Sequence, residues 1–242
     1  MKVCVLQPPY SRDTAFCDEY FAWKLARLDE CDDSLDMIVL PEYSDVPCVT
    51  KDMEETLFYH NKYMDALMEK CMATARRCHA LVFVNALDNE HGWRNTTFAF
   101  GRNGELLGKY YKKHLPPLEL ETLGLDSGYT FAPSEPYILE IEGLRYAFLT
   151  CYDFYFYESF SAIARGNVDI IIGCSLQRSD THTASEVMSR FLAYNTNAYV
   201  VRASVSFGED SPVCGAALVA TPKGELLTCM KSRIGTEIGR AS

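Results

Sequence analysis

The sequence contains no pair of cysteines separated by two residues, although it has ten cysteines in all. Zinc knuckles and thioredoxin-type dithiols use that spacing, so neither kind of site is indicated. The cysteines lie at irregular intervals, and we expect most of them to be small core residues with free thiols. A reducing, cytoplasmic location is the simplest interpretation of this cysteine content.

The sequence also lacks a long apolar run and an excess of basic residues. No stretch approaches the roughly 18 apolar residues that a membrane helix needs, and Met1–Tyr10 does not resemble a secretory signal. The 23 Lys and Arg residues are outnumbered by 33 Asp and Glu, which gives a net charge of -10. Nucleic-acid binding requires clustered cations, so we expect neither a nucleic acid nor a membrane as a partner.

Short β-rich runs alternate with amphipathic segments along the chain, a pattern typical of the α/β class with helices covering sheets. We find no repeat, linker or break in composition, which predicts a single domain over residues 1–242. The expected strands are Lys2–Gln7, Asp36–Leu40, Ala80–Ala86, Thr96–Phe100, Leu106–Tyr110, Tyr137–Glu142, Leu144–Thr150, Val168–Ile172, Tyr199–Val205 and Ala216–Thr221. The expected helices are Asp18–Asp29, Met53–Cys78, Tyr157–Arg165 and Ala184–Thr196.

Two charged residues follow predicted strands, where α/β folds usually keep their sites. Glu42 comes after the apolar run Asp36–Leu40, and partial burial would raise its pKa toward that of a general base. The alternative interpretation of Glu42 is a solvated carboxylate at a strand end. Lys112 would stabilise an oxyanion if buried, whereas the Lys112-Lys113 pair is otherwise a solvated turn.

Cys151 directly follows the predicted strand Leu144–Thr150, at a strand-to-helix turn. Backbone N–H groups and the helix dipole at such a turn favour the thiolate, which is the nucleophilic form. The backbone N–H of Tyr152 is also placed to donate to an oxyanion. The alternative interpretation of Cys151 is one more buried core cysteine. His114 suggests a Cys–His dyad, but a lone histidine is more often a hydrogen-bonded structural residue.

The order and spacing of these motifs resemble the nitrilase superfamily of carbon–nitrogen hydrolases. The matching residues are Pro41-Glu42, then Lys112-Lys113-His114-Leu115, then Cys151-Tyr152-Asp153 with Phe156 and Glu158. The resemblance covers nearly the whole chain and implies a four-layer α-β-β-α sandwich. It implies that Glu42 is the general base, Lys112 the oxyanion-stabilising cation (with Lys113 as the fallback) and Cys151 the nucleophile. No metal or organic cofactor is implied.

The resemblance also implies a second glutamate that orients the lysine. Glu121, seven residues before Gly128, fits this position best, and Glu119 is the competitor. Two positions depart from the family pattern: Tyr155 stands where relatives often have Arg, and Asn195 lies where they have a charged helix segment.

Residues beside strand ends near the three motifs are candidates for substrate binding, with core packing as the alternative. They are Tyr43, Tyr152, Phe154, Tyr155 and Ser175. An aromatic wall with few cations favours a neutral or cationic substrate over a dicarboxylate.

The function that follows from the resemblance is an amidase acting on a small amide or N-carbamoyl compound through a cysteine thioester. The alternatives are an acyltransferase, a nitrile hydrolase, or a degenerate relative that serves as a binding or scaffold protein. Family members commonly pair through helices near the nucleophile, so a homodimer or higher homo-oligomer is expected through Tyr157–Arg165 and Ala184–Thr196.

Overall fold

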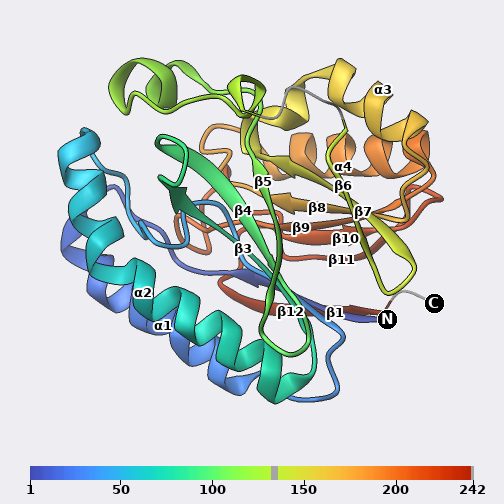
Figure 1. Cartoon of the computed structure of the whole chain (residues 1–242), viewed down its shortest axis with the longest axis horizontal. Helices are drawn as coiled ribbons and strands as arrows, with labels where there is room; N and C mark the ends of the chain where they lie inside the picture. Colours follow the sequence, from blue (N-terminus) through green and yellow to red (C-terminus); the bar gives the residue numbers. More distant parts are fainter. Residues whose placement is uncertain (132–135, 241–242) are drawn as a thin grey trace.

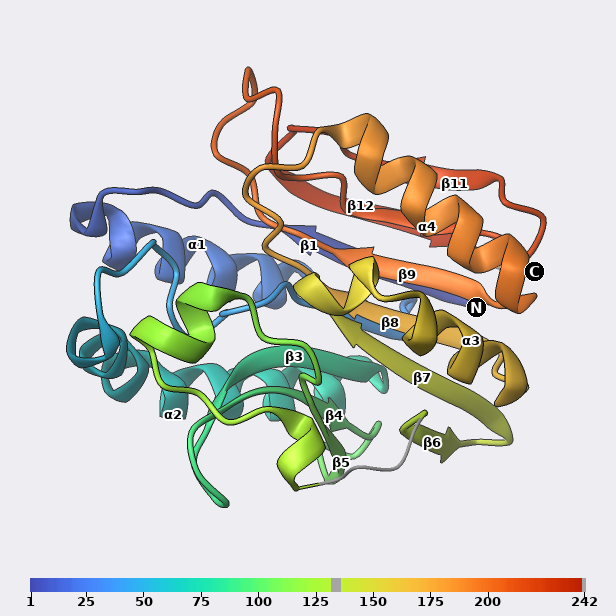
Figure 2. The ribbon, with the colours of Figure 1, turned by 90° about the horizontal axis from the view of Figure 1, so that it is seen from above.

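Two six-stranded β-sheets pack face to face, and a pair of helices covers the outer face of each (Figures 1 and 2). The computed structural model describes residues 1–131 and 136–240. This arrangement confirms the predicted α/β class and the four-layer α-β-β-α sandwich. No helix within the described ranges has both the length and the apolar character needed to cross a bilayer.

The first sheet has the strand order β12-β1-β2-β3-β4-β5. Helices α1 (Cys17–Glu30) and α2 (Met53–Cys78) lie on its outer face (Figure 1). The strands are β1 (Lys2–Gln7), β2 (Met37–Val39), β3 (Leu81–Asp88), β4 (Arg94–Phe100), β5 (Leu106–Tyr111) and β12 (Gly235–Arg240). Strands β1, β2 and β3 are parallel, whereas β4, β5 and β12 pair in antiparallel fashion.

The second sheet has the order β11-β10-β9-β8-β7-β6. Helices α3 (Tyr157–Arg165) and α4 (His182–Thr196) cover it. The strands are β6 (Ile138–Ile141), β7 (Leu144–Thr150), β8 (Ile170–Cys174), β9 (Tyr199–Ala203), β10 (Leu218–Ala220) and β11 (Leu226–Cys229). Strands β7, β8 and β9 are parallel, so their carboxyl ends lie together at one edge.

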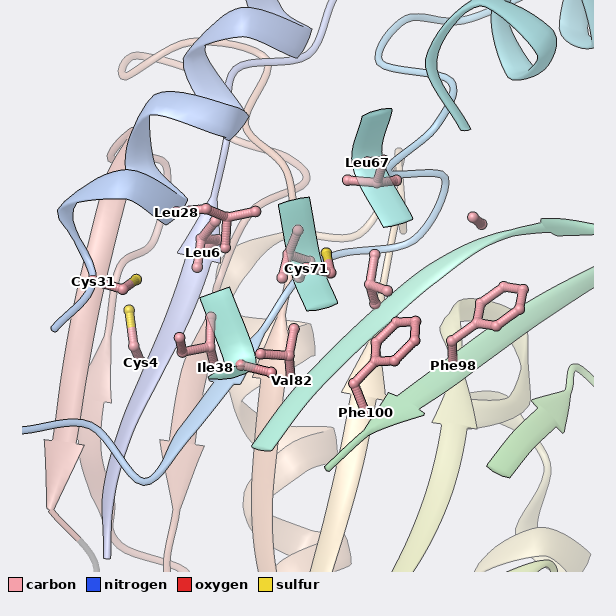
Figure 3. Packing of buried hydrophobic residues seen from close by; sticks show 14 of the residues in the cluster. Cys4, Leu6, Leu28, Cys31, Ile38, Leu67, Cys71, Val82, Phe98 and Phe100 are labelled. Carbon is pink, nitrogen blue, oxygen red and sulfur yellow. The ribbon is translucent and has the colours of Figure 1, made fainter. Parts of the chain in front are cut away.

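The period-two alternation of β1 divides its side chains between two separate cores. Cys4 and Leu6 face the helices, whereas Val3 and Val5 face the second sheet. In Figure 3, Leu6, Leu28 and Leu67 lie between the first sheet and its two helices. A third apolar cluster fills the space between the second sheet, α3 and α4. The two sheets are therefore joined by one apolar core, and each is joined to its pair of helices by another.

Most predicted elements agree with the structure to within two residues, but two strands were missed. Strand β11 has only four residues, none of them fully buried, and every second residue of β12 is exposed. The partner of β12 is β1, at the other end of the chain, with Lys2 opposite Arg240. A strand stabilised by so distant a partner carries little local signal.

Candidate active site

A cavity of about 530 Å³, open mouth included, lies where the carboxyl ends of the two sheets meet. Glu42 follows β2, Lys112 follows β5, and Cys151 follows β7. All three side chains line this cavity. The fold therefore brings together the three residues that the sequence motifs single out.

Lys112 lies between two carboxylates in the floor of the cavity. Its Nζ is 2.8 Å from Glu42 Oε1 and 2.7 Å from Glu119 Oε2. Burial lowers the pKa of Lys112, but the carboxylates of Glu119 and Glu42 outweigh burial and hold that pKa well above its usual value. Lys112 is therefore a permanent cation, and the alternative of a solvated surface turn is wrong because its side chain is only 1% exposed.

Glu119, and not Glu121, is the second glutamate beside Lys112. Both lie on a single π-helical turn, Leu118–Thr122, which follows two prolines. Residues two apart on a helical turn point in different directions, so Glu119 is buried while Glu121 is exposed to solvent. Glu119 Oε1 also accepts a hydrogen bond from the Tyr43 hydroxyl at 2.7 Å. The choice of Glu121 from the spacing to Gly128 is corrected accordingly.

Asn95, on β4, links the two glutamates and was not singled out by the sequence reasoning. Its Nδ2 donates to Glu42 Oε1 and to Glu119 Oε1, each at 2.8 Å. Its Oδ1 accepts from Asn85 Nδ2 at 2.7 Å, which fixes the orientation of the amide. One amide group can serve two carboxylates because it carries two donors. A run of polar residues in a fully buried strand, Arg94–Phe100, was the available signal.

Cys151 lies at a sharp turn between β7 and a short 3₁₀ helix, Cys151–Tyr155. Its φ of 46° is in the left-handed region, which is uncommon for a residue with a side chain. Asp153 stabilises this turn by accepting the Thr150 N–H at 2.8 Å and the Tyr110 hydroxyl at 2.9 Å. The same carboxylate accepts the backbone N–H of His114 at 2.9 Å, so it joins the cysteine turn to the lysine segment.

His114 has a structural role in this arrangement. Its Nδ1 is 3.0 Å from Asp153, and its ring stacks on Phe156 with centroids 3.7 Å apart. His114 does not line the cavity that contains Cys151. The structure therefore does not favour a Cys–His dyad.

The thiol of Cys151 is protonated in the resting site, contrary to the expected thiolate. Burial raises its pKa, the Glu42 carboxylate raises it further, and Lys112 lowers it by less. The thiol forms a hydrogen bond with Glu42, whose own pKa is raised, mainly by burial. The helical turn was expected to favour ionisation, but it has only five residues, and burial beside carboxylates outweighs it. Cys151 therefore needs a base, and Glu42 is in contact with it.

This protonation state predicts how Cys151 reacts with an alkylating reagent. We expect iodoacetamide to label Cys151 slowly at pH 7 and faster as the pH rises above 9, because the thiolate is the reactive form. In the Glu42→Gln variant the carboxylate charge is removed while Lys112 remains, so the profile should move to lower pH. Mass spectrometry of the Cys151 peptide between pH 6 and 10 measures both profiles. A wild-type midpoint below pH 8 would contradict the protonated thiol.

The structure places only one of the five expected substrate-binding residues at the cavity. Tyr43 lines it, whereas Phe154 packs beneath Gly173 and Arg202, and Ser175 is completely buried. Tyr152 lies outside the cavity lining, and Tyr155 is 47% exposed with its hydroxyl bound to Asp180 at 2.6 Å. Nearness to Cys151 in the sequence was a poor guide, because successive residues of the 3₁₀ turn point in different directions.

The cavity wall contains residues that the sequence reasoning did not identify. Arg178, after β8, and Tyr10, after β1, both line it. The expectation of few cations near the nucleophile is therefore wrong. The remaining wall is largely apolar, with Val46, Val49, Leu118, Leu123 and Leu176. Within residues 1–131 and 136–240, no group of three or more His, Cys, Asp and Glu side chains is arranged to hold a metal ion.

The contrast between the two glutamates can be tested directly. We expect Glu119→Gln to lower kcat/KM by about 10- to 100-fold, the range associated with losing one hydrogen bond to a charged group. The matched variant Glu121→Gln removes the same charge from an exposed position and should change kcat/KM by less than about twofold. Steady-state kinetics measures kcat/KM for both variants, and equal losses would refute the assignment of Glu119 as the second glutamate.

Comparisons with known proteins agree with this geometry. Residues 24–235 match the carbon–nitrogen hydrolase family. The omega-amidase NIT2 of Pongo abelii is 25% identical over 207 residues, covering 83% of this chain and 73% of the relative. The omega-amidase NIT2 of Homo sapiens is 24% identical over 208 residues, with the same two coverages.

Solved structures share the fold at lower identity. An amidase mutant from Nesterenkonia sp. AN1, with acrylamide added to its active-site cysteine, has a TM-score of 0.78 at 18% identity. That match covers 100% of this chain and 93% of the other. Another structure of an amidase from Nesterenkonia sp. has a TM-score of 0.76 at 19% identity, covering 99% and 89%. Because the family match spans most of the sequence and the fold agrees, the chain belongs to the carbon–nitrogen hydrolase family.

Proposed function

We propose that this protein is an amidase that cleaves a small amide through a thioester on Cys151. The observation that carries the proposal is the contact of the Cys151 thiol with Glu42, in a cavity that also contains the Lys112 cation. The names of its relatives, omega-amidase and amidase, support an amide as substrate.

The geometry suggests a role for each group in the first half-reaction. Glu42 takes the thiol proton as Sγ attacks the carbonyl carbon, and the carbonyl π electrons move to oxygen. Lys112 and the backbone N–H of Tyr152 stabilise that oxyanion. When the C–N bond breaks, Glu42 passes its proton to the departing nitrogen, so ammonia leaves and the acyl group stays on sulfur. The raised pKa of Glu42, caused mainly by burial, suits both steps, because it strengthens Glu42 as the base that takes the thiol proton and the same group then returns that proton to the nitrogen.

In the second half-reaction, Glu42 takes a proton from water as the water oxygen attacks the thioester carbon. The C–S bond then breaks, Sγ recovers the proton from Glu42, and the carboxylic acid leaves. Dividing the reaction into two steps replaces one difficult amide cleavage with two easier displacements.

Ammonia release from a panel of amides, carbamoyl amines and nitriles tests this proposal. Rapid quenching and mass spectrometry of the intact protein should show the acyl mass on the Cys151 peptide. Hydroxylamine added as a competing acceptor separates hydrolysis from acyl transfer. Ammonia release without an acyl-enzyme, or product formed only with the added acceptor, would refute a hydrolytic amidase.

We also propose that the protein forms a homodimer through α3 and α4. Large apolar side chains on these helices are exposed in the single chain, namely Tyr157 (64%), Val187 (60%), Phe191 (48%) and Tyr194 (71%). Such a cluster is typical of an interaction surface. Sedimentation velocity should show a dimer for the wild type and a monomer for Tyr194→Asp; a monomeric wild type would refute the proposal.

A cytoplasmic location remains a proposal. All ten cysteines are free thiols, the state that a reducing compartment maintains. Fractionation of cells that express the protein with a small epitope tag would test it, and recovery outside the cytoplasmic fraction would refute it.

A further inference from the structure

Two cysteines in the core between the first sheet and its helices, Cys4 and Cys31, are in direct contact. Cys4 lies on β1, and Cys31 is the residue that follows α1. Their thiols form a hydrogen bond with each other, and Figure 3 shows the two sulfur atoms facing one another. A disulfide forms only between cysteines whose side chains point toward each other, and this pair meets that requirement while both thiols are free.

The surroundings of the pair favour a thiolate on Cys31. The hydrogen bond from Cys4 lowers the pKa of the Cys31 thiol, and the charge of Arg77 lowers it further. Burial and the carboxylates of Asp32 and Glu30 oppose this decrease but do not cancel it. Arg77 is fixed beside Cys31, because its guanidinium donates to the backbone carbonyl oxygen of Cys31. The same thiol–thiol hydrogen bond raises the pKa of Cys4, so Cys4 keeps its proton.

A cavity separate from the candidate active site leads to the two sulfur atoms. Cys4 and Cys31 both line this cavity of about 370 Å³, open mouth included, whose wall also includes Thr236 and Ile238 of β12. Cys4 is 3% exposed and Cys31 is 6% exposed, so the cavity suits a small oxidant better than a bulky one. Hydrogen peroxide is small and uncharged, and it is therefore the oxidant that fits this access.

The other thiols are less suited to react with a peroxide. Burial raises the pKa of Cys151 and the Glu42 carboxylate raises it further, so Cys151 lacks the thiolate character that peroxides require. A second pair, Cys17 and Cys48, also shares a hydrogen bond, but neither residue lines the cavity that reaches Cys31. Cys31 combines a lowered pKa with a route for the oxidant, and it also has a thiol beside it.

We propose that Cys4 and Cys31 form a peroxide-reactive dithiol, which hydrogen peroxide converts to a disulfide that joins β1 to the end of α1. The Cys31 sulfur attacks one peroxide oxygen, the O–O bond breaks, and Cys31 becomes a sulfenic acid while one water leaves. The Cys4 sulfur then attacks the Cys31 sulfur, so that the S–S bond forms and the hydroxyl leaves with the Cys4 proton as a second water. The two thiols lose two electrons and two protons, and one peroxide is reduced to two waters.

The test treats the full chain with a small excess of hydrogen peroxide. The intact mass should fall by the mass of two hydrogens, and peptide mapping without reduction should show Cys4 joined to Cys31. The cross-link closes a loop across α1, which restricts the unfolded chain, so we expect Tm to rise by about 5–10 °C. Dithiothreitol should restore both the original mass and the original Tm.

Three alanine variants assign the roles of the two cysteines. In Cys4→Ala the sulfenic acid on Cys31 has no thiol to resolve it in the pair, so dimedone, which traps sulfenic acids, should label Cys31. In Cys31→Ala the peroxide should leave Cys4 unlabelled and without a cross-link. Cys71→Ala is the matched control, because Cys71 is completely buried in the same core and no cysteine perturbs its thiol. This variant should form the Cys4–Cys31 cross-link as the wild type does.

Cys151 provides an internal comparison that does not depend on the proposed amidase function. After the cross-link has formed, iodoacetamide at about pH 9 should still alkylate Cys151. Loss of that alkylation before the cross-link appears would show that the peroxide reacts first at Cys151, and this result would overturn the proposal. Peroxide-treated protein in which mapping finds no Cys4–Cys31 cross-link would also overturn it.

Discussion

Replacing Cys151 with alanine is expected to reduce ammonia release by at least about 10⁴-fold, the order of loss caused by removing a catalytic nucleophile. No other thiol reaches the carbonyl carbon, because Cys151 is the only cysteine among the described residues that line the cavity. Without Sγ there is no thioester, so both half-reactions are lost together.

The same change should leave the fold nearly unaltered. Cys151 is only partly buried, and alanine is subject to the same left-handed backbone strain that cysteine already experiences there. We expect the free energy of unfolding to change by about 1 kcal/mol or less. Urea denaturation alongside the ammonia assay measures both effects.

Cys174→Ala is the matched control for Cys151→Ala. Cys174 ends β8 and is completely buried outside the cavity lining. Its loss should lower the free energy of unfolding by about 1 kcal/mol through the small void that remains, while activity is retained. Ammonia release by Cys151→Ala at the wild-type rate would refute the thioester mechanism.

Replacing Lys112 with methionine is expected to damage both stability and activity. Lys112 lies between two buried carboxylates at 2.8 and 2.7 Å. Removing one member of a buried ion cluster typically costs about 3–5 kcal/mol, because the remaining charges are left uncompensated. Losing an oxyanion donor should lower kcat by a further factor of about 10² to 10³.

The pH dependence of this variant follows from the two carboxylates. Without the cation, the pKa of Glu42, already raised by burial, rises further. An acid whose pKa is higher in the folded state binds its proton more tightly when folded. The stability deficit of Lys112→Met is therefore small at low pH and grows as the pH rises through the pKa of the folded state. Urea denaturation from pH 4 to 8 measures this trend, and a deficit that shrinks with rising pH would contradict it.

Two further variants test whether uncompensated charge causes the loss of stability and whether the loss of activity is specific to Lys112. Lys112→Met/Glu119→Gln removes one carboxylate along with the cation, so part of the stability should return while activity stays low. Lys113→Met serves as the positional control, since Lys113 does not line the cavity. Equal loss of activity in Lys112→Met and Lys113→Met would show that the lysine was assigned wrongly.

Much of the fold could be predicted because its signals are local. Strand β7, Leu144–Thr150, is a mostly apolar run that ends directly at Cys151, and the buried residues of α2, Met53–Cys78, recur with a helical period. Strand β12 could not be predicted, since its antiparallel partner is β1, at the other end of the chain. Pairing of that kind depends on the assembled sheet and leaves little trace in the strand itself.

The candidate site could likewise be predicted only in part. The motifs around Glu42, Lys112 and Cys151 indicated which residues to examine, and the fold places them around one cavity. The choice between Glu119 and Glu121 depended on which side of a single π-helical turn faces Lys112. Spacing to Gly128 could not reveal that direction.

The sequence by itself determined the α/β class, the family and the three reactive residues, because short motifs and hydrophobic periods are properties of neighbouring positions. Only the tertiary structure decided the protonation of Cys151, since its pKa depends on burial and on carboxylates contributed by distant segments. It alone placed Arg178 in the cavity and Phe154 outside it. The wall of a site is assembled from strand ends that meet only when two sheets pack together, so its shape and charge are long-range properties.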